Sequence, residues 1–166
     1  FICCSHFLKT KLDTQERFRR KTIVMHNFTD AVPPLDTEKE GYVLEFGHLS
    51  RDKGTLTLLE AARRMPETQF VFAGRGAAEA EIAKVENARF VGFKTGRELE
   101  MLIRKAAVSV YPSEWYENCP FSVMESQMYG TPVLGANIGG IPELIRVGET
   151  GGLFECGNGE VLMQTI

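Results

Sequence analysis

Two glutamates separated by seven residues are the chemically most informative feature of the chain. An apolar strand over 108–111 precedes Glu117, and a proline lies between Glu117 and Glu125. Pro120 suits the first position of a helix, so we expect Glu117 on a loop and Glu125 in the first helical turns. The N–H groups of a first turn lack partners within the helix. Carboxylates that accept hydroxyl protons and amides that face phosphate would together suit a polyhydroxylated, phosphorylated ligand.

The same two glutamates also have a plainer interpretation. A loop glutamate is usually solvated, and a glutamate in the first turn of a helix interacts favourably with the helix dipole. For two isolated glutamates this interpretation would be the default. Only the neighbouring motifs can change it.

Two glycine-containing loops are the next candidates. Residues 47–54 follow an apolar strand and open a helix, so their amides and Lys53 can bind phosphate. Residues 74–79 resemble a nicotinamide dinucleotide fingerprint, but Glu79 replaces the third glycine and no acidic residue ends the next strand. We therefore expect a tight strand-to-helix turn there, and an oxidoreductase is disfavoured.

Length, composition and charge describe an ordinary globular domain. The chain has 166 residues, 43% of them hydrophobic and 25% charged, which allows one well-buried core. A net charge of -3 argues against a dedicated nucleic-acid binder. The four cysteines show neither zinc-ligand spacing nor a disulfide framework, which favours a reducing cytoplasm. No stretch approaches the roughly 18 apolar residues that a membrane-spanning helix needs.

Strand-like and helix-like patterns alternate along the chain. This predicts an α/β fold of the Rossmann-like, doubly wound type, a mostly parallel sheet with flanking helices. The expected strands are 42–46, 69–73, 88–91, 108–111 and 132–135. The expected helices are 55–65, 77–86, one that opens with a capping box over 95–98, and 121–129. Ligands bind beyond the carboxyl ends of such strands, and each motif falls at one of those ends. Residues 90–93 are expected mostly in the core.

Taken in order, these motifs resemble the carboxyl-terminal, donor-binding domain of GT-B-fold retaining glycosyltransferases, in the group 1 family that carries the E-x7-E motif. The segments that carry the resemblance are 47–54, 74–76, 90–93, 117–125, 130–133 and 139–144. The resemblance implies a nucleoside-diphosphate sugar as donor and retaining transfer of a hexose-type sugar to an acceptor. It also implies no cofactor and no metal, and the chain offers no Asp-x-Asp pair.

The resemblance also implies roles for single residues. Glu117 would be the catalytic group that faces the forming oxocarbenium charge, and Glu125 would accept hydrogen bonds from the ribose. Lys53 would hold the diphosphate, but His48 stands where the family has an arginine, and Arg51 is our hypothesis for a substitute. The other donor-binding residues implied are Gly47, Gly92, Phe93, Asn118, Cys119, Pro120, Phe121 and Ser122.

The resemblance further implies that residues 1–30 are the tail end of an amino-terminal acceptor domain. A linker over 31–40, with Pro33 and Pro34, would lead to a donor domain over 41–166 that is incomplete at its carboxyl end. Because the chain begins without methionine in an apolar run, we interpret it as a fragment. The strand-like stretches 1–4 and 22–25 would then lack native partners. We expect residues 1–30 to be disordered, to lie against the donor domain, or to pair with a second copy.

The expected partners follow from the same resemblance, and the expected location follows from the cysteine pattern. The sugar, glycan or lipid-linked acceptor would bind through a domain outside this chain, and the fragment alone is expected to be inactive. We expect a cytoplasmic protein with no nucleic-acid partner. Peripheral contact of the full-length protein with the inner face of the membrane stays open, through parts outside this chain. A non-catalytic nucleotide-sugar-binding module also stays open, because His48 replaces the usual arginine.

Overall fold

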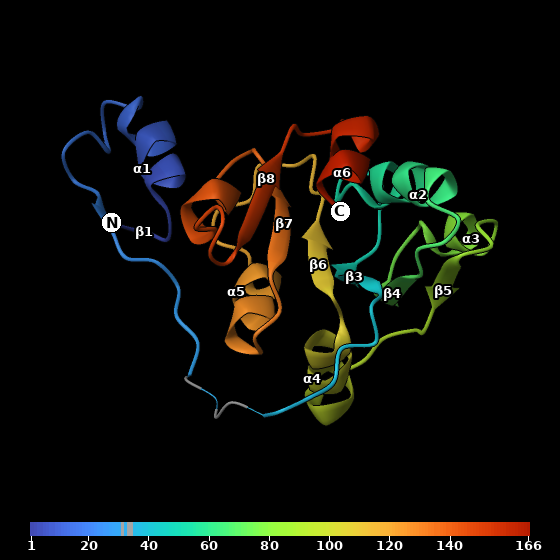
Figure 1. The fold of residues 1–166 in the computed structure, drawn as a ribbon. Coiled ribbons are helices and arrows are strands. Elements are labelled where there is room, and N and C mark those ends of the chain that lie inside the picture. Colours follow the sequence, from blue (N-terminus) through green and yellow to red (C-terminus); the bar gives the residue numbers. More distant parts are fainter. Residues whose placement is uncertain (31, 33–34) are drawn as a thin grey trace.

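The computed structural model describes residues 1–30, 32 and 35–166 of the chain (Figure 1). Pro33 and Pro34 of the expected linker lie outside the described residues. The main element is a six-stranded, fully parallel sheet, which confirms the predicted doubly wound α/β class. Its strands are β3 (Val43–His48), β4 (Phe70–Arg75), β5 (Ala88–Phe90), β6 (Val108–Tyr111), β7 (Val133–Ala136) and β8 (Gly151–Phe154).

The helices follow the strands in alternation, as the sequence predicts. They are α2 (Thr55–Arg64), α3 (Glu79–Ile82), α4 (Gly96–Lys105), α5 (Phe121–Met128), the 3-10 helix η1 (Ile141–Leu144) and α6 (Gly159–Thr165). In Figure 1, α2 and α6 lie together on one side of the sheet and α4 lies on the other. No described helix has the length and apolar character needed to cross a bilayer.

The strand order, β5-β4-β3-β6-β7-β8, reverses direction at β3. The chain first builds outward from β3 to β5, and α4 then returns it so that β6 pairs with the other side of β3. The carboxyl ends of β3 and β6 are therefore neighbours in the sheet. Such a reversal is where open α/β sheets place their ligands.

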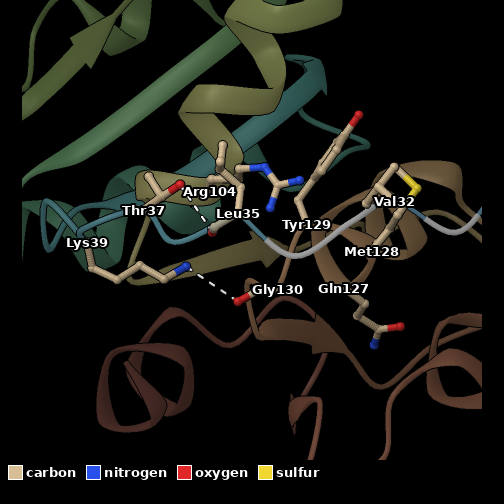
Figure 2. A pocket seen from close by; sticks show the side chains of 9 residues that line it. All are labelled: Val32, Leu35, Thr37, Lys39, Arg104, Gln127, Met128, Tyr129 and Gly130. Carbon is tan, nitrogen blue, oxygen red and sulfur yellow. Dashed lines mark hydrogen bonds between the residues drawn. The ribbon is translucent and has the colours of Figure 1, made fainter.

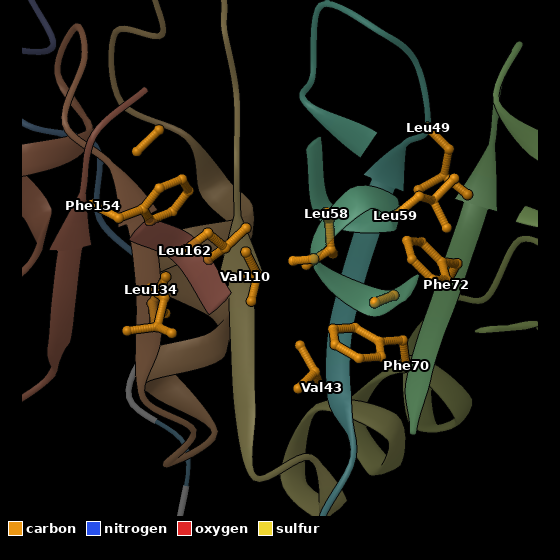
Figure 3. Close-up of a cluster of buried hydrophobic side chains, with 14 of the residues drawn as sticks. Val43, Leu49, Leu58, Leu59, Phe70, Phe72, Val110, Leu134, Phe154 and Leu162 are labelled. Carbon is orange, nitrogen blue, oxygen red and sulfur yellow. The ribbon is translucent and has the colours of Figure 1, made fainter. Parts of the chain in front are cut away.

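Two apolar layers hold the sheet between the helices. Side chains alternate along β3, so Val43 belongs to the cluster under α2 and Leu44 to the cluster under α4. Figure 3 shows the larger cluster, in which the fully buried Phe70 and Phe72 of β4 pack with Leu58 of α2. Because both faces of the central strands are covered, those strands appear in the sequence as nearly continuous apolar runs.

Several local expectations were wrong. The helix expected over 77–86 is only the short α3. Thr95 is the N-cap of α4 but makes no side-chain cap bond, and Glu98 pairs with Lys94 at 3.3 Å instead of completing a capping box. Pro120 is the N-cap of α5 and not its first helical residue.

Residues 90–93 were expected mostly in the core, and among their apolar side chains only that of Val91 packs against a buried cluster. Phe90 and Phe93 are 37% and 55% exposed. The physical reason is that β5 is an edge strand, so its outer side has no neighbour in the sheet.

The amino-terminal segment forms a small unit of its own. β1 (Ile2–Cys3) and β2 (Ile23–Val24) pair in parallel on either side of α1 (His6–Asp13), outside the six-stranded sheet. Of the three expected states, the structure therefore shows an ordered segment that lies against the rest of the chain, with contacts to the turn at Glu143. Its assignment to a separate acceptor domain stays a prediction.

Candidate functional site

The loops that follow β3 and β6 touch at the point where the strand order reverses. Gly54, at the start of α2, has a φ of +78°, and a Cβ there would lie 1.9 Å from the carbonyl oxygen of Pro112. The N–H of Glu114 donates to the carbonyl of Asp52 at 2.9 Å. Only glycine permits both this backbone conformation and this approach. The two loops thus form one continuous surface over the carboxyl ends of β3 and β6.

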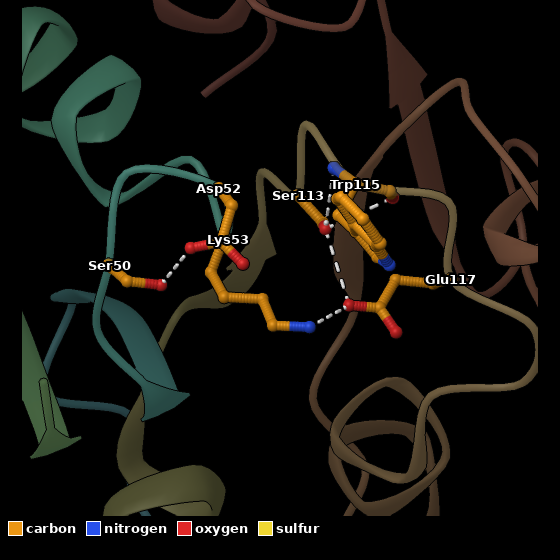
Figure 4. Close-up of polar contacts among 6 residues, drawn as sticks. All are labelled: Ser50, Asp52, Lys53, Ser113, Trp115 and Glu117. Carbon is orange, nitrogen blue, oxygen red and sulfur yellow. Dashed lines mark hydrogen bonds and ion pairs between the residues drawn. The ribbon is translucent and has the colours of Figure 1, made fainter.

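Lys53 and Glu117 face one another across this junction (Figure 4). The Lys53 ammonium forms an ion pair with Oε1 of Glu117, and the two side chains are 27% and 15% exposed. The same Glu117 oxygen lies 3.3 Å from the hydroxyl of Ser113, which is buried. Sequence reasoning predicted both charged residues but missed Ser113. The pair places a cation and an anion side by side in a partly covered site.

Short polar contacts fix the rest of both loops. The Ser113 hydroxyl accepts the N–H of Trp115 at 3.3 Å, and Trp115, which is 62% exposed, lies beside Glu117 (Figure 4). On the facing loop, the Ser50 hydroxyl donates to Asp52 at 2.6 Å and lowers the pKa of that carboxyl.

A glycine turn supports the loop of Glu117 from behind. The N–H of Gly140 donates to the carbonyl of Glu117 at 2.6 Å. A Cβ at Gly140 would lie 1.8 Å from the carbonyl oxygen of Asn118, and one at Gly139 would lie 2.5 Å from that of Glu117. The turn before η1 therefore packs directly onto the backbone that carries Glu117.

The start of α5 brings further expected residues to the same place. A Cβ at Gly47 would lie 3.7 Å from the hydroxyl of Ser122, so the end of β3 faces the first turn of α5. Glu125 is half-buried in this helix, and burial raises its pKa. Burial also raises the pKa of the Cys119 thiol, which suits packing better than nucleophilic chemistry. Phe121 is 55% exposed.

The remaining expected donor-binding residues differ in burial and in their position relative to Lys53 and Glu117. Pro120 is buried, Asn118 is exposed, and Gly92 is half-buried beyond the end of β5. Gly92 accepts the N–H of Gly74 at 3.0 Å through its carbonyl, which ties it to the end of β4. Gly92 and Phe93 thus border the β4 side of the site and not the Lys53–Glu117 junction.

Arg75 is a cation that sequence reasoning missed. His48 is exposed at the end of β3, and its register partner on β4 is Arg75. The Arg75 guanidinium lies 4.7 Å from the ring centroid of Phe93. Arg51, our expected substitute for an arginine at position 48, is exposed on the same loop as His48. Residues 47–48 and residues 74–75 each end a predicted strand. This shared position was the sequence signal that could have indicated Arg75 as a site residue.

A buried acid beneath the site was also missed. Glu45 on β3 is buried, and its Oε1 accepts the hydroxyl of Thr55, the first residue of α2, at 2.8 Å. Its other oxygen has no hydrogen-bond partner among the described residues. Burial raises the pKa of Glu45 to about 8. Burial and the carboxylates of Glu117 and Glu45 raise the pKa of the nearby Tyr111 phenol as well.

The pocket in Figure 2 lies at the opposite edge of the sheet. Its volume is about 260 Å³, and its residues precede β3, β6 and β7 in sequence, at the amino ends of those strands. Lys39 donates there to Thr131 at 2.9 Å. This pocket is therefore distinct from the Lys53–Glu117 site.

Metal binding has no structural candidate in the described part of the chain. No group of three or more His, Cys, Asp and Glu side chains gathers there in a way that could hold an ion. The expectation that neither metal nor cofactor takes part stays a prediction.

The fold is that of a Rossmann-like domain, and the candidate site lies at a strand-order reversal. Residues 28–166 match the family described as "Glycosyl transferases group 1", and the chain belongs to this family. It is 32% identical over 124 residues to the sulfoquinovosyl transferase SQD2 of Arabidopsis thaliana, and the match covers 71% of this chain and 24% of that protein. It is 33% identical over 120 residues to a glycogen synthase of Mycobacterium tuberculosis, with 66% of this chain and 29% of that protein covered.

Solved structures of low sequence identity share the fold. A structure of Anabaena HepE, described as a complex with UDP and glucose, superposes with a TM-score of 0.81 at 22% identity, covering 98% of this chain and 51% of that one. Sucrose-phosphate synthase of Thermosynechococcus elongatus gives a TM-score of 0.82 at 21% identity, covering 99% and 47%. The chain thus spans about half the length of these proteins and less of the curated relatives.

Proposed function

We propose that the chain is the donor-binding part of a retaining glycosyltransferase, which transfers a hexose-type sugar from a nucleoside-diphosphate sugar to a sugar, glycan or lipid-linked acceptor. One observation carries the proposal: Lys53 and Glu117 meet where the strand order reverses, between two loops fixed to one another by backbone contacts. Membership of the family supports it. So does the HepE structure, whose description includes UDP and glucose.

The geometry suits a step in which charge develops on both sides of a breaking bond. The departing diphosphate needs a cation and backbone amides, which Lys53 and the first turns of α2 and α5 offer. The sugar becomes positively charged as the bond breaks, and the Glu117 carboxylate would stabilise that charge. When the diphosphate takes Lys53, Glu117 is released to face the sugar. The ion pair is then the resting arrangement of two groups that separate on donor binding.

Glu125 has a different task in this scheme. It lies on α5, beyond the loop, and is half-buried. A carboxylate in that setting would accept hydrogen bonds from two neighbouring hydroxyls of a ribose. Because hydroxyl donors favour the ionised carboxylate, donor binding would oppose the effect of burial on its pKa.

The binding test compares three variants in calorimetry with uridine, guanosine, adenosine and thymidine diphosphates. We expect this chain to bind one of them with a Kd of about 10 μM to 1 mM. The expected affinity is weak because this chain would form only one side of the binding cleft, which leaves the ligand partly solvated. Lys53→Met and Glu125→Ala should each weaken binding about 10- to 100-fold, since each removes a charged hydrogen-bonding group. Glu117→Ala should leave binding of the bare diphosphate nearly unchanged.

Lys84→Met is the matched control, because Lys84, two residues beyond α3, forms an exposed pair with Glu81 at 2.7 Å. It should bind as the unaltered chain does. Absence of binding by any diphosphate at millimolar concentration would refute the donor-site assignment. Equal losses in Glu117→Ala and Glu125→Ala would refute the division of roles. For the full-length protein, the anomeric configuration of the product decides whether transfer is retaining.

A non-catalytic nucleotide-sugar-binding module is the second candidate. The observation that favours it is His48, which offers one N–H where a guanidinium would offer a fixed fork. Arg75, the register partner of His48, stacks on Phe93 and is the nearest guanidinium on the neighbouring strand. Turnover of the donor by the full-length protein separates the two candidates. Binding without turnover under all acceptor conditions would favour the module.

A further inference from the structure

One carboxylate fastens the amino-terminal segment to the six-stranded domain. Oε2 and Oε1 of Glu143, on η1, accept the N–H groups of His6 and Phe7, each at 2.7 Å. These are the first N–H groups of α1, which have no partner inside the helix. The Ser5 hydroxyl accepts the N–H of Leu8 at 3.1 Å. A carboxylate is also the group that the positive end of the helix dipole favours.

The same carboxylate binds the other end of the segment. Nε2 of His26, just beyond β2, lies 3.0 Å from Oε2 of Glu143. Burial alone would raise the pKa of Glu143, but the bonds from His26, His6 and Phe7 together lower it. Because β1 and β2 are parallel, the start of α1 and the exit of β2 emerge at the same edge. Glu143 therefore joins both.

The glycine turn before η1 is bonded to the donor loop, which we define as residues 115–119. Gly140 donates its N–H to the carbonyl of Glu117 at 2.6 Å. A Cβ at Gly140 would lie 1.8 Å from the Asn118 oxygen and 3.1 Å from the Cβ of Ser5. The start of α1, the glycine turn and the donor loop are thus stacked without room for a side chain at the middle position.

Three further contacts join the segment to the donor loop directly. The Asn27 amide donates to the carbonyl of Cys119 at 3.2 Å. The rings of Phe7 and Tyr116 lie 5.1 Å apart, and the Lys11 ammonium lies 5.2 Å from the Tyr116 ring centroid. Both ends of the donor loop are therefore held by residues from the amino-terminal segment.

We propose that Glu143 is a positioning residue: by anchoring α1 and His26 on η1 it holds the donor loop, and with it Glu117, in one place. The role of Glu117 toward the sugar rests on the proposed function, whereas the anchoring does not. Lys53 and Glu125 lie on elements that these contacts do not touch. Loss of the anchor should therefore spare the bare diphosphate and affect what Glu117 contributes to the intact nucleotide sugar.

Amide hydrogen exchange on the complete 166-residue chain tests the anchor without any ligand. Glu143→Ala should speed exchange at residues 6–7 about tenfold or more, since these two amides lose their acceptor. Exchange at the donor loop should rise about threefold, because the loop loses the support of the anchored segment. Glu143→Gln keeps one acceptor oxygen and should fall between. Glu149→Ala is the matched control, a nearby glutamate whose partner Arg146, at 3.1 Å, lies within its own turn. It should change neither region.

Asn27→Ala provides an independent variant if Glu143→Ala folds poorly. It removes the bond to Cys119 and leaves the Glu143 contacts, so exchange should rise at the donor loop and not at residues 6–7. Unchanged exchange at the donor loop in both Glu143→Ala and Asn27→Ala would overturn the proposal, whatever the ligand results are.

The ligand arm compares a nucleoside diphosphate with its sugar conjugate. The unaltered chain should bind the nucleotide sugar more tightly than the bare diphosphate. Glu143→Ala should remove most of this difference in affinity, while its affinity for the bare diphosphate should stay within about twofold of that of the unaltered chain. Faster exchange with an unchanged difference in affinity would overturn the positioning role. If the unaltered chain binds neither ligand, the proposed function fails, and the exchange results alone decide whether Glu143 is the anchor.

Discussion

The six-stranded domain and the amino-terminal segment both contain parallel strands joined by a helix, but they bury very different amounts of apolar surface. The larger sheet has fully buried side chains on its central strands, including Phe70, Phe72 and Leu44. In the segment, α1 has no buried residue, and Ile2 and Ile23 are each 62% exposed. Two strands and one helix of this kind do not make a stable unit by themselves.

The difference shows that similar connectivity can rest on different forces. The larger domain is stabilised by the hydrophobic effect, which acts over its whole interior. The segment is held by directional polar contacts to a neighbour, above all those of Glu143. Lys53 belongs to the first region alone, whereas the loop of Glu117 contacts both. A change in the amino-terminal segment should therefore affect the position of Glu117 more than that of Lys53.

Phe72→Ala should produce the largest effect in this comparison. The ring is fully buried between β4 and the helices above it, so its removal should cost about 3 to 5 kcal/mol of unfolding free energy. Urea unfolding followed by circular dichroism measures this. Ile23→Ala, in the segment, should change the same quantity by no more than about 0.5 kcal/mol. A similar loss in both variants would mean that the segment shares the core of the domain.

Glu45→Gln should raise stability in a way that depends on pH. The pKa of Glu45 is about 8 in the folded chain against an ordinary 4.5, so the folded state keeps a proton that the unfolded state releases. Stability should therefore fall as the pH rises from about 4.5 to about 8, by at most about 1.4 kcal/mol per pH unit. Glutamine removes this slope and can still bond to Thr55.

Urea midpoints measured between pH 5 and pH 8.5 test the role of Glu45. The slope should be present in the unaltered chain and in the control Glu160→Gln, and absent in Glu45→Gln. Glu160 is a suitable control because its side chain is 66% exposed on α6. Identical slopes in all three proteins would show that Glu45 does not hold its proton in this range.

Two helix caps extend the comparison to smaller effects. The Ser5 hydroxyl accepts a bond from Leu8, whereas Thr95 makes no such bond at the start of α4. Ser5→Ala should destabilise α1 by about 1 kcal/mol, and Thr95→Ala should cost only a few tenths. Hydrogen exchange of the first turn of each helix measures both. An equal loss at Thr95 would indicate that its side chain caps the helix in solution after all.

The sequence predicted the regular parts of the larger domain well, for a physical reason. Its central strands are covered on both faces, so Val43–His48 and Val108–Tyr111 appear as apolar runs followed by glycine or proline turns. Lys53 and Glu117 could be placed at the carboxyl edge of the sheet because each follows one of these strands. The elements that the sequence did not predict are those whose structure depends on contacts with other elements. β8 begins with Gly151 and Gly152, which have little strand preference and are held by pairing with β7.

The polar details of the site were harder to predict than its position. A bond from Glu143 to the start of α1 joins residues far apart in sequence, and nothing in the local pattern of either stretch indicates it. The burial of Glu45 contradicts its residue type, and only the packing of α2 over β3 reveals it. The stacking of Arg75 on Phe93 likewise follows from two strand ends that the fold places side by side.

Deletion of residues 1–35 should have the smallest effect on the larger domain and gives the most direct test of the comparison. If the segment is held only by surface contacts, the unfolding midpoint of the remaining chain should stay nearly the same. Affinity for a bare nucleoside diphosphate should stay within about threefold, since Lys53 and Glu125 keep their surroundings. Any dimer content seen in sedimentation should fall, because β1 and β2 expose unpaired strand edges that a second copy could extend. Failure of the shortened chain to fold would show that residues 1–35 contribute to the core and that a domain boundary near residue 40 is wrong.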